Sequence, residues 1–179
     1  MADRIPFSII KRKANKLLSD CGIETDSIDV KNRNDISTDL EKIANCRNIN
    51  IIYRDFSDDI SGVFFKKDGK LYLGVNKTHF ETRQRFTIAH EIGHHILHTD
   101  DILHYDDFEK KNEEMYFRAD KIRSSQETEA NFFAAEILMP AALIASCVEN
   151  GIEYVDSLAN SFNVSPEAMR YRLTNLGYL

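Results

Sequence analysis

The sequence lacks the features that mark several classes of protein. It has no tryptophan, and only three prolines and seven glycines among 179 residues. The three cysteines, Cys21, Cys46 and Cys147, include no CxxC pair. This predicts reduced thiols rather than a disulfide framework or a thiolate zinc site. The longest apolar stretch, residues 137–148, is too short to cross a bilayer and is interrupted by Pro140, so we expect no membrane-spanning segment.

Positive charge is also scarce. The 23 lysines and arginines are outnumbered by 29 acidic residues, which gives a net charge of −6. This balance argues against broad binding to a nucleic-acid backbone. At the N-terminus, Asp3 and Arg4 precede only a short apolar stretch, unlike a secretory signal. We therefore expect a cytoplasmic protein with a single domain over residues 1–179.

The first half of the chain combines helical and strand patterns. Apolar spacing predicts a helix over residues 7–21, and Thr38 with Glu41 forms a capping-box pattern before a short helix ending near Cys46. Strands are predicted over 49–53, 61–66 and 70–75, the last two joined at Asp68-Gly69 as a hairpin. Together with the helices that follow, these strands indicate an α+β fold with a small sheet.

The second half is predicted to be largely helical. A long helix is expected over 80–98, which holds four of the six histidines. An acidic segment, residues 99–120, is predicted to be a solvated surface loop, with a lid as the less favoured alternative. Ser124 and Glu127 then form a second capping-box pattern. The remaining helices are expected over 124–139, 140–149, 153–161 and 166–176.

The residues that carry chemistry lie in the long helix, where His90, Glu91 and His94 form an HExxH motif. Residues four apart in a helix are about 6 Å apart along its axis and about 40° apart around it. His90 and His94 can therefore share one metal ion. Glu91 lies about 100° further round, beside the metal, where a general base would act on water. Gly93 would allow another backbone to pass close to this helix.

A catalytic zinc needs a third protein ligand, and helix 124–139 supplies the best candidates. Glu127 and Asn131 share one face of this helix, so Glu127 is the favoured ligand and Asn131 a candidate partner that orients a histidine. Glu129 is the less favoured alternative, because it is more simply explained as a solvated carboxylate. His95 and His98 are not needed for the metal and are expected to serve packing or solvation.

These residues resemble the ImmA/IrrE-type metallopeptidases. The resemblance rests on residues 83–94, RQRFTIAHEIGH, and 127–140, ETEANFFAAEILMP, and extends from about residue 35 to the end. It implies a zincin-like metallopeptidase domain with a zinc-binding core over about 35–140 and closing helices over 140–177. By position, it implies one zinc ion held by His90, His94 and Glu127, with Glu91 as catalytic base. Asn131 stands where such enzymes carry an acid.

The resemblance also implies a substrate class, because members often cleave helix-turn-helix repressors of mobile elements or stress operons. Such a repressor would here be a separate polypeptide. Strand 70–75 is the expected edge for an extended peptide substrate. The second donor to the oxyanion stays open among five residues, namely Tyr72, His98, Tyr105, Tyr116 and Arg118.

Two other functions remain open. The chain could be a non-proteolytic zinc-containing module that binds or senses a transcription factor. Residues 158–176 also resemble a helix-turn-helix, with Arg170 and Arg172 as its only cationic readers. Apolar packing explains the same pattern, so we expect no direct nucleic-acid binding.

Overall fold

The structure is a computed structural model that describes residues 4–25, 28–32, 35–98, 103–104 and 123–179. Within these ranges the chain forms seven helices and one four-stranded sheet, which confirms the predicted α+β class. The helices are α1 (Phe7–Asp20), α2 (Leu40–Cys46), α3 (Glu81–Leu97), α5 (Arg123–Leu138), α6 (Ala141–Glu149), α7 (Val155–Phe162) and α8 (Pro166–Leu176). The strands are β1 (Ile49–Arg54), β2 (Gly62–Lys67), β3 (Lys70–Asn76) and β4 (Leu103–His104).

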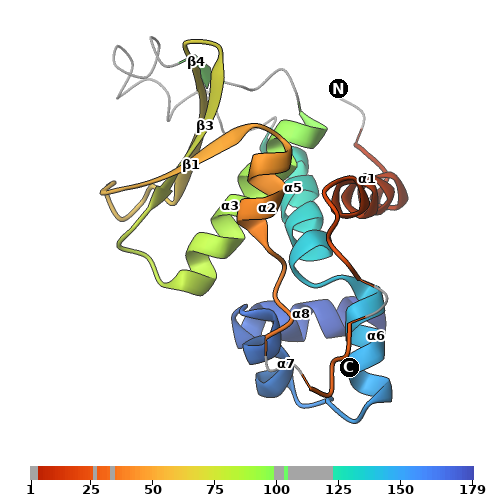
Figure 1. Cartoon of the computed structure of the whole chain (residues 1–179). Helices are drawn as coiled ribbons and strands as arrows, with labels where there is room; N and C mark the ends of the chain where they lie inside the picture. The colour runs from red at the N-terminus through yellow and green to blue at the C-terminus, as the bar shows by residue number, and fades with distance from the viewer. Residues whose placement is uncertain (1–3, 26–27, 33–34, 99–102, 105–122) are drawn as a thin grey trace.

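The elements are arranged in layers around α3 (Figure 1). One side of α3 packs on β2 and β3, and α5 runs along its other side. Helix α1 lies against α5 on the side away from the sheet, and α6, α7 and α8 gather at the opposite end of the molecule from the sheet. Because α5 lies between two helices, it buries residues on more than one of its faces: Glu129, Ala130, Phe133, Ala134, Glu136 and Ile137.

The sheet has the order β1-β3-β2-β4, which corrects the predicted substrate edge. The expected edge strand is β3, but it pairs in parallel with β1 and antiparallel with β2, so both of its sides are occupied. Its last four residues, Leu73–Asn76, are buried, as in a central strand. On the outer side of β2, β4 pairs only with Phe65 and Lys66. Among the described residues, the unpaired edge near α3 is therefore the beginning of β2.

Two helix starts differ from the predicted capping boxes. The N-cap of α2 is Asp39, whose side chain accepts from the Lys42 amide. Thr38 instead donates its hydroxyl to the carbonyl of Ile137, 2.6 Å away, and so ties the start of α2 to α5. Helix α5 already includes Arg123, so Ser124 is not its N-cap. The predicted start of α8 is confirmed, because the Ser165 hydroxyl accepts from the Ala168 amide.

The closing helices bury one of the two candidate cationic readers, Arg172, and leave the other, Arg170, exposed, so the expectation of no nucleic-acid binding stays a prediction. Arg172, one of the two candidate readers, is buried and donates to both carboxylate oxygens of Glu136, at 2.7 and 2.9 Å. The apolar residues that α7 and α8 share with the rest of the core are also buried: Leu158, Ala159, Phe162, Val164, Met169 and Leu173.

The prediction of three reduced thiols is wrong for two of the cysteines. Cys21, just after α1, and Cys46, at the end of α2, form a disulfide with Cα atoms 5.6 Å apart. Spacing along the chain did not reveal this pair, because it depends on the end of α1 lying near the end of α2 in the folded chain. Cys147 is free and buried, as expected.

Most of the acidic segment 99–120 lies outside the described residues, so its prediction as a surface loop stays a prediction. Within the described ranges, no helix alone has the length and apolar character needed to cross a membrane. In the same ranges, one pair of helices, Ser125–Leu138 and Ala141–Glu149, has this length and apolar character when the two are taken together, but the pair is bent by 45°.

Candidate metal centre

Helix α3 places His90 and His94 one turn apart on the face that meets α5. Their Nε2 atoms are 3.0 Å apart. Gly93 lies between them in sequence and faces the α5 backbone, where a Cβ would lie 3.2 Å from the carbonyl oxygen of Ala130. The expectation that Gly93 permits a close backbone approach is therefore confirmed.

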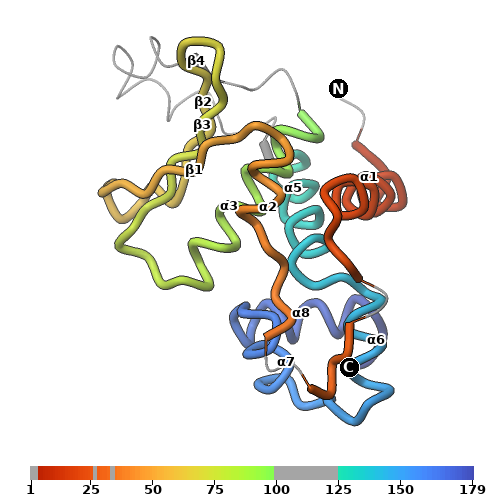
Figure 2. The backbone as a smooth tube through the Cα atoms, in the orientation of Figure 1, coloured from red at the N-terminus to blue at the C-terminus, as the bar shows by residue number. Residues whose placement is uncertain are grey.

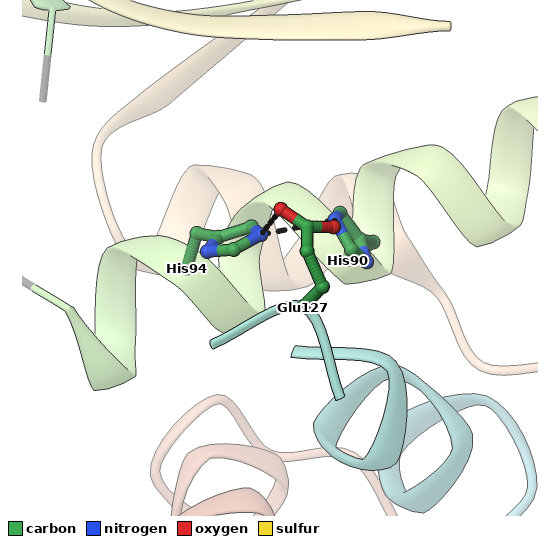
Figure 3. A group of neighbouring side chains, drawn as sticks. All are labelled: His90, His94 and Glu127. Carbon is green, nitrogen blue, oxygen red and sulfur yellow. Dashed lines mark hydrogen bonds and ion pairs between the residues drawn. The ribbon is translucent and has the colours of Figure 1, made fainter. Parts of the chain in front are cut away.

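Helix α5 adds a carboxylate to this pair. Glu127 places Oε2 3.3 Å from Nε2 of His90 and Oε1 3.3 Å from Nε2 of His94. Figure 3 shows the carboxylate facing both rings from the neighbouring helix. The structure thus brings together the three residues predicted as metal ligands. Their donor atoms all lie within 4.8 Å of one another.

Asn131 lies behind His90, as the sequence predicted. Its Oδ1 is 2.8 Å from Nδ1 of His90. With the amide oxygen facing the ring, His90 must donate from Nδ1. In a neutral imidazole this leaves the Nε2 lone pair directed at the cluster.

The residues behind His94 were missed. Nδ1 of His94 lies 3.2 Å from Nδ1 of His98, and Nε2 of His98 lies 2.8 Å from Oε2 of Glu129. Glu129 is only 2% exposed, so its prediction as a solvated carboxylate is wrong. Residues on both faces of α5 are covered, a fact that a helical-wheel count cannot show. The repeat of histidines at 90, 94 and 98 was the available signal for a role of His98.

With neutral imidazole rings and an ionised Glu129, these contacts allow one direction for each hydrogen bond. An ionised Glu129 can only accept, so His98 donates from Nε2 and accepts at Nδ1. His94 then donates from Nδ1 and keeps its lone pair on Nε2. Two lone pairs and a carboxylate therefore converge within 3.0–3.3 Å, which is stable only with a positive ion, a proton or a metal, among them.

The donor set fits a zinc ion. Ligand atoms about 2.0–2.1 Å from a tetrahedral metal lie about 3.3 Å from each other, close to the distances found here. Two imidazoles and one carboxylate are a common set in catalytic zinc sites, where the fourth position is left for water or substrate.

The electrostatics of the cluster agree with its geometry. When no metal is bound and Nε2 of His90 and His94 carries a proton, hydrogen bonds from both rings hold the pKa of Glu127 well below its usual range, although burial acts in the opposite direction. Burial lowers the pKa of His90, but its bond to Glu127 and the charges of Glu91 and Glu127 outweigh this, so the net shift is upward. Glu127 is thus ionised. Its carboxylate can accept hydrogen bonds from both rings, or bind a metal ion together with them.

Glu91 lies on the same helix but outside the donor cluster. Burial raises its pKa, and the neighbouring charges of His90 and His94 reduce this rise. A Cβ at Gly62 would lie 3.5 Å from Cγ of Glu91 and would collide with Cγ2 of Thr87. The acidic group therefore lies beside the start of β2, where the side of that strand is unpaired among the described residues.

The other candidates divide clearly. His95 stacks on Phe64, with ring centroids 4.8 Å apart, and serves packing as expected. Tyr72 stacks on Phe65 in the sheet, and His98 is engaged by His94 and Glu129. Tyr105, Tyr116 and Arg118 lie outside the described residues. None of the five is singled out as the second oxyanion donor.

Comparison with known proteins identifies the family of this site. The family model described as the IrrE N-terminal-like domain, a peptidase family, matches residues 44–174. The chain belongs to this family. The match spans most of the chain and includes every residue of the candidate metal centre, so the predicted resemblance is confirmed.

Two individual proteins that resemble this chain align with it over only part of their own length. The radiation response metalloprotease IrrE of Deinococcus radiodurans is 36% identical over 103 residues, covering 56% of this chain and 30% of that protein. A solved structure of a Mycobacterium tuberculosis transcriptional regulator has a TM-score of 0.59 at 18% identity, covering 93% of this chain and 46% of the other. That structural likeness shows the fold alone. The chain thus spans less than half the length of either relative.

Proposed function

We propose that this chain is a zinc-dependent endopeptidase that hydrolyses a peptide bond in a partner protein. The observation that carries the proposal is the convergence of His90, His94 and Glu127 donor atoms beside Glu91. Membership of a peptidase family supports it. The regulatory setting is also proposed. The substrate class is a transcriptional repressor of helix-turn-helix type on a separate chain, and the enzyme acts in the cytoplasm.

In this proposal, His90 and His94 would hold the zinc through Nε2, and Glu127 would hold it through its carboxylate. When bound, zinc supplies a Lewis acid that polarises the scissile carbonyl and makes water a better nucleophile at neutral pH. Glu91 takes the proton from the attacking water and passes it to the leaving amine. Its raised pKa suits this exchange, because a base must both accept and release a proton near the working pH.

The substrate is proposed to bind along the beginning of β2 rather than along β3. A peptide added as a strand there would lie beside Gly62 and Glu91. The close approach of β2 to α3 at Gly62 keeps that edge near the donor cluster.

The test begins with purified wild-type chain and its Glu91→Gln variant. We expect about one zinc per chain in both, measured by elemental analysis, because Glu91 lies outside the donor set. In cells expressing each protein, labelling of new protein N-termini should reveal cleavage products only with wild type. The rate of peptide-bond cleavage by Glu91→Gln should be at least 10²-fold lower than that of wild type.

The same experiment separates the alternative of a binding or sensor module. Regulation that persists in Glu91→Gln, with zinc retained and no new N-termini, would favour that module. A wild-type chain that takes up no zinc would refute the peptidase proposal.

A further inference from the structure

The N-terminal segment reaches the outer layer of the metal centre. The backbone amide of Ile5 donates to Oε1 of Glu129, 2.8 Å away, while Oε2 of the same carboxylate accepts from His98. The matched family region begins at residue 44, so this contact comes from a part of the chain outside it. Figure 2 shows the N-terminal helix lying beside α5.

Helix α1 holds this segment against both helices of the site. The ring of Phe7 stacks on Phe132 of α5, with centroids 4.4 Å apart. Lys13 donates from Nζ to the carbonyl of Ile96 on α3, 3.3 Å away. Helix α1 thus contacts both α3 and α5, which carry the metal-binding residues, and this packing holds the Ile5 amide next to Glu129.

The hydrogen bonds form one continuous chain from Ile5 through Glu129 and His98 to His94. Each carboxylate oxygen of Glu129 serves one N–H donor. Only a group with two acceptors can serve both sides at once, and a carboxylate is such a group. The side chain is buried, so water cannot readily replace either partner.

We propose that Glu129 is a positioning residue that couples the N-terminal segment to the metal centre, one oxygen holding the His98–His94 pair and the other holding Ile5. The inference rests on the proposed function in one respect, that His94 binds zinc. It predicts that docking of the N-terminal segment and binding of zinc stabilise each other.

Glu129→Gln tests the coupling because an amide has one acceptor and one donor. If its oxygen faces Ile5, its NH₂ group meets Nε2 of His98. His98 must then accept at Nε2 and donate from Nδ1, so His94 has to accept at Nδ1 and carries its proton on Nε2, where it opposes metal binding. If its oxygen faces His98, the NH₂ group meets the Ile5 amide and the N-terminal contact is lost. We expect the zinc dissociation constant, measured by chelator competition, to rise about 10- to 100-fold.

Glu149→Gln is the matched control, because it removes the same charge at an exposed position at the end of α6. We expect its zinc affinity to equal that of wild type. Wild-type affinity in Glu129→Gln would overturn the coupling while leaving the peptidase proposal intact. Failure of wild type to bind zinc would overturn both, and the wild-type titration identifies that case.

A second measurement needs no substitution and so does not depend on whether Glu129→Gln folds. Coupling is reciprocal, so zinc must slow hydrogen exchange at the Ile5 amide by the factor with which that contact tightens zinc. We expect slowing of several-fold when zinc is added to metal-free wild type. Equal exchange at Ile5 with and without zinc would overturn the proposal.

Discussion

Each clustered histidine is held from behind by a side chain that sets which nitrogen faces the metal position. Asn131 holds His90, and the pair of His98 and Glu129 holds His94. The two supports differ in charge, because one ends in a neutral amide and the other in a buried carboxylate. A carboxylate partner raises the basicity of a ligand histidine more than an amide does.

Substitution of Asn131 should therefore change zinc affinity in both directions. Asn131→Ala removes the acceptor for Nδ1 of His90 and should weaken zinc binding about 10-fold. Asn131→Asp keeps the geometry, adds a charge and should tighten binding. Chelator competition on the two variants measures both effects, and unchanged affinity in Asn131→Ala would show that His90 needs no such support.

Among the helices and strands, the closeness of α3 and α5 decides whether ligands from two helices can meet. Their backbones approach at Gly93, next to His94, where the neighbouring atoms include the carbonyl oxygen and Cα of Ala130. Backbone atoms cannot rotate aside as the end of a long side chain can. The spacing of the ligands thus depends on the absence of a side chain at this position.

Gly93→Ala should destabilise the protein although alanine favours a helix by about 1 kcal/mol over glycine. The added Cβ would lie 3.2 Å from the Ala130 oxygen, and forcing atoms into such packed contacts typically costs about 1–3 kcal/mol. It should also weaken zinc binding by moving His94 away from Glu127. Urea unfolding and zinc titration test this, and a variant with wild-type affinity would show that the helices can separate without opening the cluster.

For the molecule as a whole, an ion pair and a disulfide join elements that are separated in the sequence. The ion pair of Arg172 and Glu136 joins α8 to α5, and the disulfide of Cys21 and Cys46 joins the end of α1 to α2. Disulfides are rare in a reducing cytosol. The bond between Cys21 and Cys46 therefore argues against the expected cytoplasmic location, which stays a prediction.

Reduction of the disulfide should lower the free energy of unfolding. The bond closes a loop between residues 25 apart in sequence, which corresponds to roughly 3 kcal/mol of stabilisation in the chain-entropy account. Urea unfolding with and without a reductant measures the difference. Cys46→Ser should be insensitive to the reductant, and a wild type that is equally insensitive would contradict the prediction.

The sequence alone determined the features that depend on neighbours along the chain. The histidine spacing of the 90–94 motif, the shared face of Glu127 and Asn131, the Asp68-Gly69 hairpin and the start of α8 at Ser165 all follow from helix periodicity or turn chemistry. Each such signal spans only a few residues, and the structure has the same local geometry at each.

Only the tertiary structure decided the features that depend on packing between distant segments. The central place of β3, the bond between Cys21 and Cys46, the hydroxyl of Thr38 on α5 and the burial of Glu129 each involve partners far apart in sequence. Hydrophobic burial is non-directional, so a local pattern shows that a face is covered without showing which element covers it. In this protein, the contact between the Ile5 amide and Glu129 is such a feature: Ile5 lies outside the matched family region, and only the folded structure shows that it reaches Glu129 behind the metal centre.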